Sequence, residues 1–243
     1  MNEFRGSRKQ ILDMLDRKDF VDRFNTLLTG TDAIVGRDDS WAPKGVLSPN
    51  EVQLRDFEPF RDTWPAQHKN ITEWWPKHPA RRPVWDMVLT AQIGDKKGLI
   101  LVEGKAHEGE LDRTGKKKDA DASDESLHNH EKIRQNIEKA CGELSHLIEG
   151  FSISRDTHYQ LSNRITFAWK LASEGIPTIL MYLGFLCDTY FRDYLRDGDH
   201  WQRVIGAYLD GIVPLSFPEK WIGCGASKMY MAIRALKVQE ISK

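Results

Sequence analysis

Two β-rich stretches near the middle of the chain decide the fold. Residues 84–93 read VWDMVLTAQI and residues 98–106 read GLILVEGKA, and the tetrapeptide GDKK, residues 94–97, separates them. Runs rich in valine, isoleucine and leucine favour strands, and a Gly-Asp pair between two such runs favours a tight reversal. We therefore predict a β-hairpin about residues 94–97.

The segments around this hairpin predict an α/β fold. Residues 177–186 (PTILMYLGFL) are apolar at nearly every position, as expected for a strand that is covered on both faces. The tail from Trp221 onward is compatible with either a strand or a helix. Helices are expected where apolar residues recur at helical spacing, in residues 1–30, 133–147, 161–171 and 201–209. The expected architecture is an α/β sandwich with helices on both sides of a mixed β-sheet.

Two local features carry further expectations. Ser7 followed by Gln10 resembles a helix capping box, in which both side chains satisfy amides of the first helical turn. Residues 112–125 (DRTGKKKDADASDE) contain alanine as their only apolar residue type and cannot contribute to a core. We expect this stretch to be a mobile surface loop.

Length and composition bound the class of protein. The 243 residues fit one domain, residues 1–243, with a helical and irregular N-terminal extension (1–69), a core (70–187) and a C-terminal helix and tail (188–243). Lys plus Arg total 35 and Asp plus Glu total 36, a balance that excludes a histone-like polycation but permits a local basic groove. We find no secretory signal, no apolar run of membrane-spanning length and no CxxC pair, so a cytoplasmic protein without a membrane partner is expected.

Charged side chains continue a buried row on the second strand of the hairpin. Side chains alternate between the faces of a strand, so Glu103 and Lys105 share the face of Leu99 and Leu101. Burial of two such charges costs several kcal/mol each unless something compensates. Either they pair with each other, or they bind a cation and an anion. On the preceding strand, Asp86 stands in an apolar run, and the hairpin would bring it to the same end of the sheet as Glu103.

Two carboxylates and an amine at one place have a chemical use. Mg²⁺ favours carboxylate and carbonyl oxygens, so Asp86, Glu103 and the backbone carbonyl of Gly104 are candidate metal ligands, with Mn²⁺ as a substitute. Lys105 would orient a water molecule or stabilise charge on a phosphate. These are the parts that metal-assisted phosphodiester hydrolysis requires.

The pattern of Asp86 followed by Glu103-Gly104-Lys105 resembles the catalytic signature of the PD-(D/E)XK nuclease superfamily. The resemblance covers roughly residues 70–187 and implies a restriction-endonuclease-like fold and Mg²⁺-dependent hydrolysis of nucleic acid, more often DNA than RNA. It implies that Asp86, Glu103 and Lys105 are catalytic, with Asp86, Glu103 and the Gly104 carbonyl on the metal. Trp85 stands where the family name has proline, and Pro83 lies three residues before Asp86.

The resemblance also suggests auxiliary positions. Many members carry an acid on the helix before the hairpin, and Glu73 is the best match. Many also carry a polar cluster on the following helix, where Gln160, Asn163 and Arg164 stand at i, i+3 and i+4 and so share one helical face.

Two basic clusters flank the predicted site and are candidates for phosphate contacts. They comprise Lys77, Arg81 and Arg82 before the first strand and Lys116, Lys117 and Lys118 after the second. Acidic residues 119–125 nearly cancel the second cluster, so a solvated loop is an equal alternative.

Other functions stay open at this stage. In one alternative, the protein has the same fold but is a catalytically inactive nucleic-acid-binding or interaction module. In another, the same metal site hydrolyses a smaller phosphate-containing substrate. A homodimer is as compatible with the sequence as a single chain. Four tryptophans, Trp64, Trp74, Trp75 and Trp85, lie close together in the sequence. Core packing is the expected role of most of them, and base stacking is the alternative.

Overall fold

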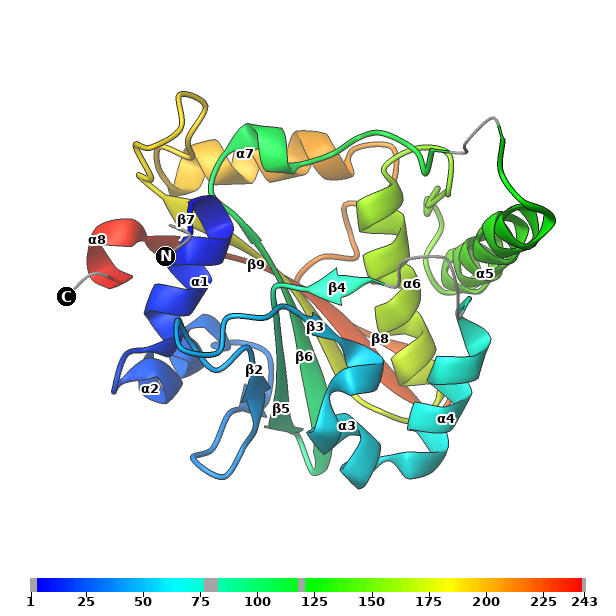
Figure 1. Ribbon diagram of the computed structural model, residues 1–243, viewed down its shortest axis with the longest axis horizontal. Coiled ribbons are helices and arrows are strands. Elements are labelled where there is room, and N and C mark those ends of the chain that lie inside the picture. Colours follow the sequence, from blue (N-terminus) through cyan, green and yellow to red (C-terminus); the bar gives the residue numbers. More distant parts are fainter. Residues whose placement is uncertain (1–3, 77–82, 118–120, 242–243) are drawn as a thin grey trace.

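The computed structural model describes residues 4–76, 83–117 and 121–241 (Figure 1). Its α-helices are α1 (Gly6–Leu15), α2 (Phe20–Leu27), α3 (Glu58–Thr63), α4 (Pro65–Trp74), α5 (Asp124–Leu147), α6 (Tyr159–Ser173), α7 (Gly198–Leu209) and α8 (Val238–Ile241). Short 3₁₀ helices are η1 (Leu54–Asp56) and η2 (Glu108–Glu110). The strands are β1 (Ala33–Ile34), β2 (Trp41–Ala42), β3 (Val52–Gln53), β4 (Val84–Trp85), β5 (Met87–Ile93), β6 (Lys96–Lys105), β7 (Thr178–Leu186), β8 (Trp221–Cys224) and β9 (Ser227–Lys237).

A mixed sheet forms the centre of the molecule. Its strand order is β1-β5-β6-β7-β9-β8, and β2 pairs with the same strand, β5, as β1 does. β5 and β6 are antiparallel, whereas β6, β7 and β9 run parallel to one another. The carboxyl ends of three strands therefore meet at one edge of the sheet. β3 and β4 form a separate two-stranded ladder.

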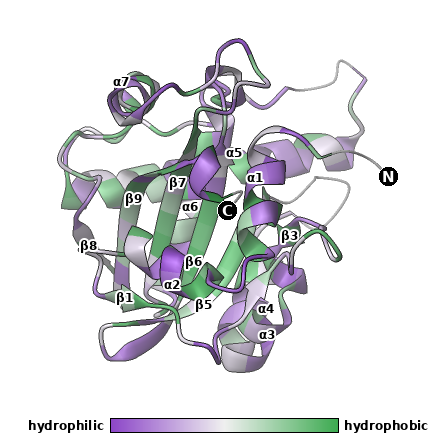
Figure 2. Cartoon of the chain, turned by 90° about the vertical axis from the view of Figure 1, so that its left-hand side faces the viewer, coloured by the Kyte–Doolittle hydropathy of each residue, from purple (hydrophilic) through white to green (hydrophobic). Residues whose placement is uncertain are grey.

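Helices cover both faces of the sheet, as the sequence predicts. Figure 1 shows α1, α2 and α8 on one side and α3, α4, α5 and α6 on the other. Alternate residues of β6 divide accordingly, because Leu99 and Leu101 belong to the core under α5 and α6, whereas Ile100 and Val102 pack with α1 and α2. Figure 2 shows the hydrophobic strands of the sheet behind the more polar helices of the α1 side.

The predicted hairpin, buried strand and central helices are confirmed. The β5–β6 ladder runs from Ile93↔Lys96 to Met87↔Val102, and β7 is buried along its whole length. Of the four tryptophans, Trp75 and Trp85 are completely buried, and Trp64 and Trp74 pack against the same core, which confirms the packing role.

Two expectations about local structure are wrong. The N-terminal helix is broken into α1 and α2, and Ser7 and Gln10 form no capping box, because their side chains bond to Glu110 and Asp188 instead. The expected surface loop is present at residues 112–117 and 121–123, which lie outside regular helices and strands and are mostly exposed. Thr114 pairs with Thr157, the amide of Lys116 donates to the Arg155 carbonyl at 2.8 Å, and α5 already begins at Asp124.

The tail forms strands of the central sheet. β9 lies between β7 and β8, and every residue of β7 has a partner in it, from Thr178↔Met229 to Leu186↔Lys237. The sheet thus extends beyond residue 187, where the sequence places the end of the core. Within the described ranges, no helix is both long and apolar enough to cross a bilayer.

Candidate active site

Asp86 and Gly104 meet where the β5–β6 ladder ends. The last paired residues are Met87 and Val102, so the next position of β6 on that side, Gly104, faces Asp86 instead of a strand partner. The Gly104 amide donates to Asp86 Oδ2 at 2.8 Å. Since the N–H and C=O of a strand residue point to the same edge, the Gly104 carbonyl is also directed to the side of Asp86.

Glycine at residue 104 has a packing reason. A Cβ added there would lie 2.9 Å from Ile11 Cδ1 of α1 and 3.1 Å from a ring carbon of Phe185. α1 thus closes the back of β6 at this point, and the side chains of Glu103 and Lys105 occupy the opposite face.

Glu103 and Lys105 are close together and almost completely buried, as the alternation along β6 predicts. Their exposed fractions are 1% and 4%, and Lys105 Nζ lies 3.5 Å from Glu103 Oε2. Lys105 Nζ also donates to Gln160 Oε1, 3.0 Å away in the first turn of α6. The structure therefore brings Asp86, Glu103, Lys105 and Gln160 together.

Arg164 holds the other oxygen of Glu103. Its Nε donates to Glu103 Oε1, and its Nη2 donates to the Val84 carbonyl of β4 at 2.7 Å. The guanidinium also lies 4.5 Å from the centre of the Trp85 ring. Asn163 is linked to the cluster through Arg164, whose Nη1 donates to Asn163 Oδ1 at 3.0 Å. Arg164 thus holds Glu103 Oε1, and the other carboxylate oxygen, Oε2, faces Lys105.

The electrostatics of the cluster centre on Asp86. Enclosure by protein and the negative charge of Glu103 raise the pKa of Asp86 from 3.8 to about 7, against the opposing effects of Lys105, the Gly104 amide and Arg164. The carboxyl is therefore balanced between its neutral and charged forms near neutral pH. Such a perturbed group in a cluster of charges is typical of functional sites.

Sequence reasoning missed Tyr182. This residue of β7 lies directly beside Glu103 in the β6–β7 register, is completely buried, and has no hydrogen-bond partner for its hydroxyl among the described residues. Burial, together with Tyr208 and Glu103, raises the pKa of Tyr182 well above 10. The signal in the sequence was a tyrosine within the otherwise apolar run PTILMYLGFL, because the hydroxyl of a buried tyrosine usually requires a specific polar environment.

Two carboxylates and one carbonyl are a small ligand set, yet one that suits Mg²⁺. Where residues are described, no group of three or more His, Cys, Asp or Glu side chains could hold a metal ion. Mg²⁺ commonly uses only one or two carboxylates and keeps waters and substrate phosphates as its other ligands. Burial and, after it, the negative charge of Glu103 raise the pKa of Asp86, and a bound cation would offset the repulsion between these two carboxylates. Asp86, Glu103 and the Gly104 carbonyl therefore fit this ion.

The remaining predicted positions lie farther out or outside the described residues. Glu73 is exposed on α4, and its carbonyl accepts from Lys132 Nζ at 3.1 Å, so the structure places this side chain at the surface and not in the cluster. Lys116 is half-buried with its ammonium 5.0 Å from the Tyr159 ring centre, and Lys117 is exposed. The other four basic positions, Lys77, Arg81, Arg82 and Lys118, lie outside the described residues.

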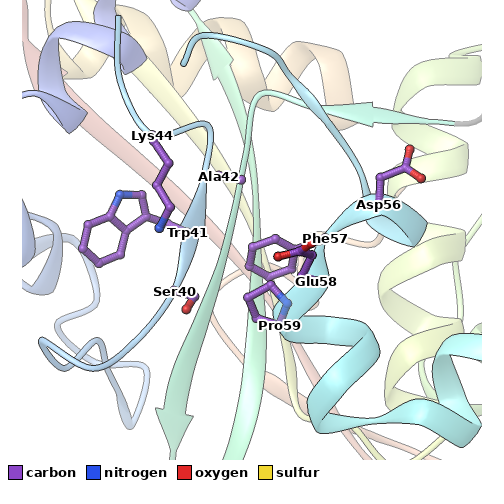
Figure 3. A pocket seen from close by; sticks show the side chains of 8 residues that line it. All are labelled: Ser40, Trp41, Ala42, Lys44, Asp56, Phe57, Glu58 and Pro59. Atoms are coloured by element: carbon purple, nitrogen blue, oxygen red, sulfur yellow. The ribbon is translucent and has the colours of Figure 1, made fainter. Parts of the chain in front are cut away.

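A separate cavity of about 380 Å³ lies between β2 and the start of α3 (Figure 3). Trp41 and Lys44 form one wall, with the Lys44 ammonium 4.8 Å from the Trp41 ring centre, and Phe57 and Glu58 form the other. None of the predicted site residues that the structure describes lines this cavity, and its charged groups, including Asp56, are of mixed sign.

Comparison with known proteins gives no independent assignment. No family model, curated protein or solved structure matches this chain.

Proposed function

We propose that this protein is a Mg²⁺-dependent nuclease that hydrolyses phosphodiester bonds of nucleic acid, with DNA as the preferred polymer. One observation carries the proposal. Asp86, Glu103 and Lys105, which come from consecutive segments of one hairpin, meet at the carboxyl end of β6. We identify this cluster with the PD-(D/E)XK signature and the fold with the restriction-endonuclease-like architecture.

The arrangement of elements supports that identification. An antiparallel hairpin, β5–β6, is followed by α5 and α6 and then by the buried strand β7, which lies parallel to β6. This is the order that the superfamily uses. α6 lies over the site strand and contributes Gln160 and Arg164 from a single face. The site thus draws on two strands and one helix, each held by the core.

Each residue has a role that follows from its contacts. Arg164 holds Glu103 Oε1, so Glu103 presents Oε2 as a single ligand oxygen. Gln160 holds the Lys105 ammonium beside that oxygen, where it would stabilise negative charge that develops on a phosphate. Bound Mg²⁺ would polarise the phosphate and lower the pKa of a water molecule. Asp86, whose pKa is about 7, would bind the ion in its charged form.

A cleavage assay tests this proposal. Purified protein is incubated with single-stranded and duplex DNA and RNA, with Mg²⁺, with Mn²⁺ or with EDTA. We expect cleavage that depends on the metal and that falls at least about 100-fold in Lys105→Ala and Asp86→Asn. Cleavage that both substitutions leave unchanged would overturn the assignment.

A second candidate is a nucleic-acid-binding or interaction module that lacks turnover. The observation that favours it is charge balance, because Lys105 and Arg164 already offset Asp86 and Glu103 without any ion. Titration calorimetry with Mg²⁺ and Mn²⁺ separates the two. A nuclease shows a binding site that Asp86→Asn abolishes, whereas an inactive module shows no such site.

A further inference from the structure

A row of stacked rings begins two residues beyond Lys105. The His107 ring is stacked on Phe191 with centres 4.1 Å apart and an angle of 17° between their planes. Tyr190 meets Phe191 edge to face at 5.0 Å, and the Arg5 guanidinium lies 4.9 Å from the centre of the Tyr190 ring. We call this row, His107–Phe191–Tyr190–Arg5, the aromatic ladder.

Backbone bonds fix the aromatic ladder to the site strand. Leu195 donates to the carbonyl of Ala106 at 3.3 Å, Glu108 donates to the carbonyl of Asp193 at 3.0 Å, and His107 pairs with Tyr194 in an isolated bridge. The loop after β7 is thus tied to the segment that directly follows Lys105. Two extended residues cover about 7 Å, so the ladder begins a short distance from the proposed catalytic lysine.

The outer end of the aromatic ladder is exposed and borders a pocket. Tyr190 is 57% exposed. It lines a pocket of about 360 Å³ together with Arg5 and Lys9 at the start of α1 and with Gln10 and Asp188. The pocket lies at the carboxyl ends of the parallel strands, the edge at which open α/β sheets bind ligands.

Two cations border the pocket. Arg5 and Lys9 line it and are exposed. Carboxylates lie nearby as well: Asp188 accepts from Gln10, Asp193 accepts from His107 and from the Gly109 amide, and Asp13 pairs with Lys9. An exposed ring beside cations is the combination that proteins use for single strands, in which bases stack on rings and cations follow the backbone.

We propose that the aromatic ladder binds unpaired nucleotides that flank the bond at the Asp86–Glu103–Lys105 cluster, so that the substrate is single-stranded nucleic acid or a single-stranded end. This inference rests on the proposed function, because it takes the cluster as the place of cleavage. A base stacks on Tyr190, and Arg5 and Lys9 contact the neighbouring phosphates. Duplex DNA cannot use Tyr190 in this way, since its bases are already stacked and paired.

Binding is measured by fluorescence anisotropy in EDTA, where no metal-dependent cleavage occurs. The probes are a labelled mixed-sequence DNA of about 20 nucleotides, longer than the site of one ordinary single-strand-binding module, and its duplex. We expect tighter binding of the single strand and a loss of about 5-fold or more in Tyr190→Ala. Tyr190→Phe should bind like the wild type because it keeps the ring. Leu215→Ala, which changes another exposed apolar side chain, is the control.

The two proposals fail in different ways. Unchanged affinity in Tyr190→Ala, or tighter binding of duplex than of single strands by the wild type, would overturn the role of the aromatic ladder even if Mg²⁺-dependent cleavage occurs. Loss of single-strand binding in Tyr190→Ala, with no cleavage by the wild type in Mg²⁺, would support the ladder and reject the nuclease. A second pair of variants tests the cations: Arg5→Gln should reduce the salt dependence of single-strand binding, and Arg61→Gln on α3 should not.

Discussion

Replacement of Asp86 by asparagine should make the metal-free protein more stable at alkaline pH. Asparagine has nearly the same shape and keeps an oxygen to accept the Gly104 amide, so the substitution removes little besides the ionisable group. In the wild type, that group ionises with a pKa of about 7 instead of 3.8, because burial and Glu103 disfavour its charge.

The sign and size of the effect follow from linkage. A carboxyl whose pKa is higher in the folded than in the unfolded protein stabilises the fold fully at pH values below its unfolded pKa, and this contribution is lost as pH rises through the folded pKa. The difference between 3.8 and about 7 corresponds to about 4 kcal/mol. This is an upper value, because Asp86 retains some solvent contact.

Urea unfolding of both proteins in EDTA at pH 5, 6.5 and 8 measures the effect. The difference in unfolding free energy between variant and wild type should grow with pH and reach about 2–4 kcal/mol in favour of Asp86→Asn at pH 8. Effects of other titrating groups cancel in this difference. Mg²⁺ at pH 8 should stabilise only the wild type. A variant that is less stable than the wild type at pH 8 would refute the reasoning, because the carboxylate would then be a net stabiliser.

Three further predictions concern other contacts of the structure. Lys105→Ala should reduce cleavage about 100-fold or more while single-strand affinity in EDTA changes little, whereas Lys96→Ala, at the opposite end of the same strand, should cleave normally. Arg164→Met removes one of the two cationic partners of buried Glu103 and should lower the unfolding free energy by about 3–5 kcal/mol. A loss below about 1 kcal/mol in urea unfolding would contradict a buried pair. Gly98→Ala places a Cβ 2.4 Å from the Pro177 carbonyl oxygen and should cost about 1–3 kcal/mol, while Gly142→Ala, which meets nothing within 4 Å on helix α5, should be neutral or stabilising in the same assay.

Much of the site was predictable because it depends on local rules. The reversal at residues 94–97 and the alternation along GLILVEGKA fix which side chains share a face and which end of the sheet they reach. Asp86, Glu103 and Lys105 are brought together by that hairpin alone. Helical spacing likewise places Gln160 and Arg164 on one side of α6.

The remaining features depend on partners far away in the chain. Ser7 and Gln10 look like capping residues, but their bonds go to Glu110 and Asp188, more than 100 residues distant. The apolar residues of the tail Ser227–Lys237 are compatible with either a strand or a helix. The segment forms a strand because its backbone pairs with the edge of β7 that β6 leaves open. Tyr182 enters the site only through the register of β6 with β7, which no local pattern specifies.

The most direct measurement is a crystal of the protein soaked with Mn²⁺ and examined by anomalous difference density. We expect a peak within about 2.0–2.3 Å of an Asp86 oxygen, of Glu103 Oε2 and of the Gly104 carbonyl, and no such peak in Asp86→Asn. Density for the ion elsewhere, or none at a saturating Mn²⁺ concentration at pH 8, would contradict the claim that these three oxygens form a metal site.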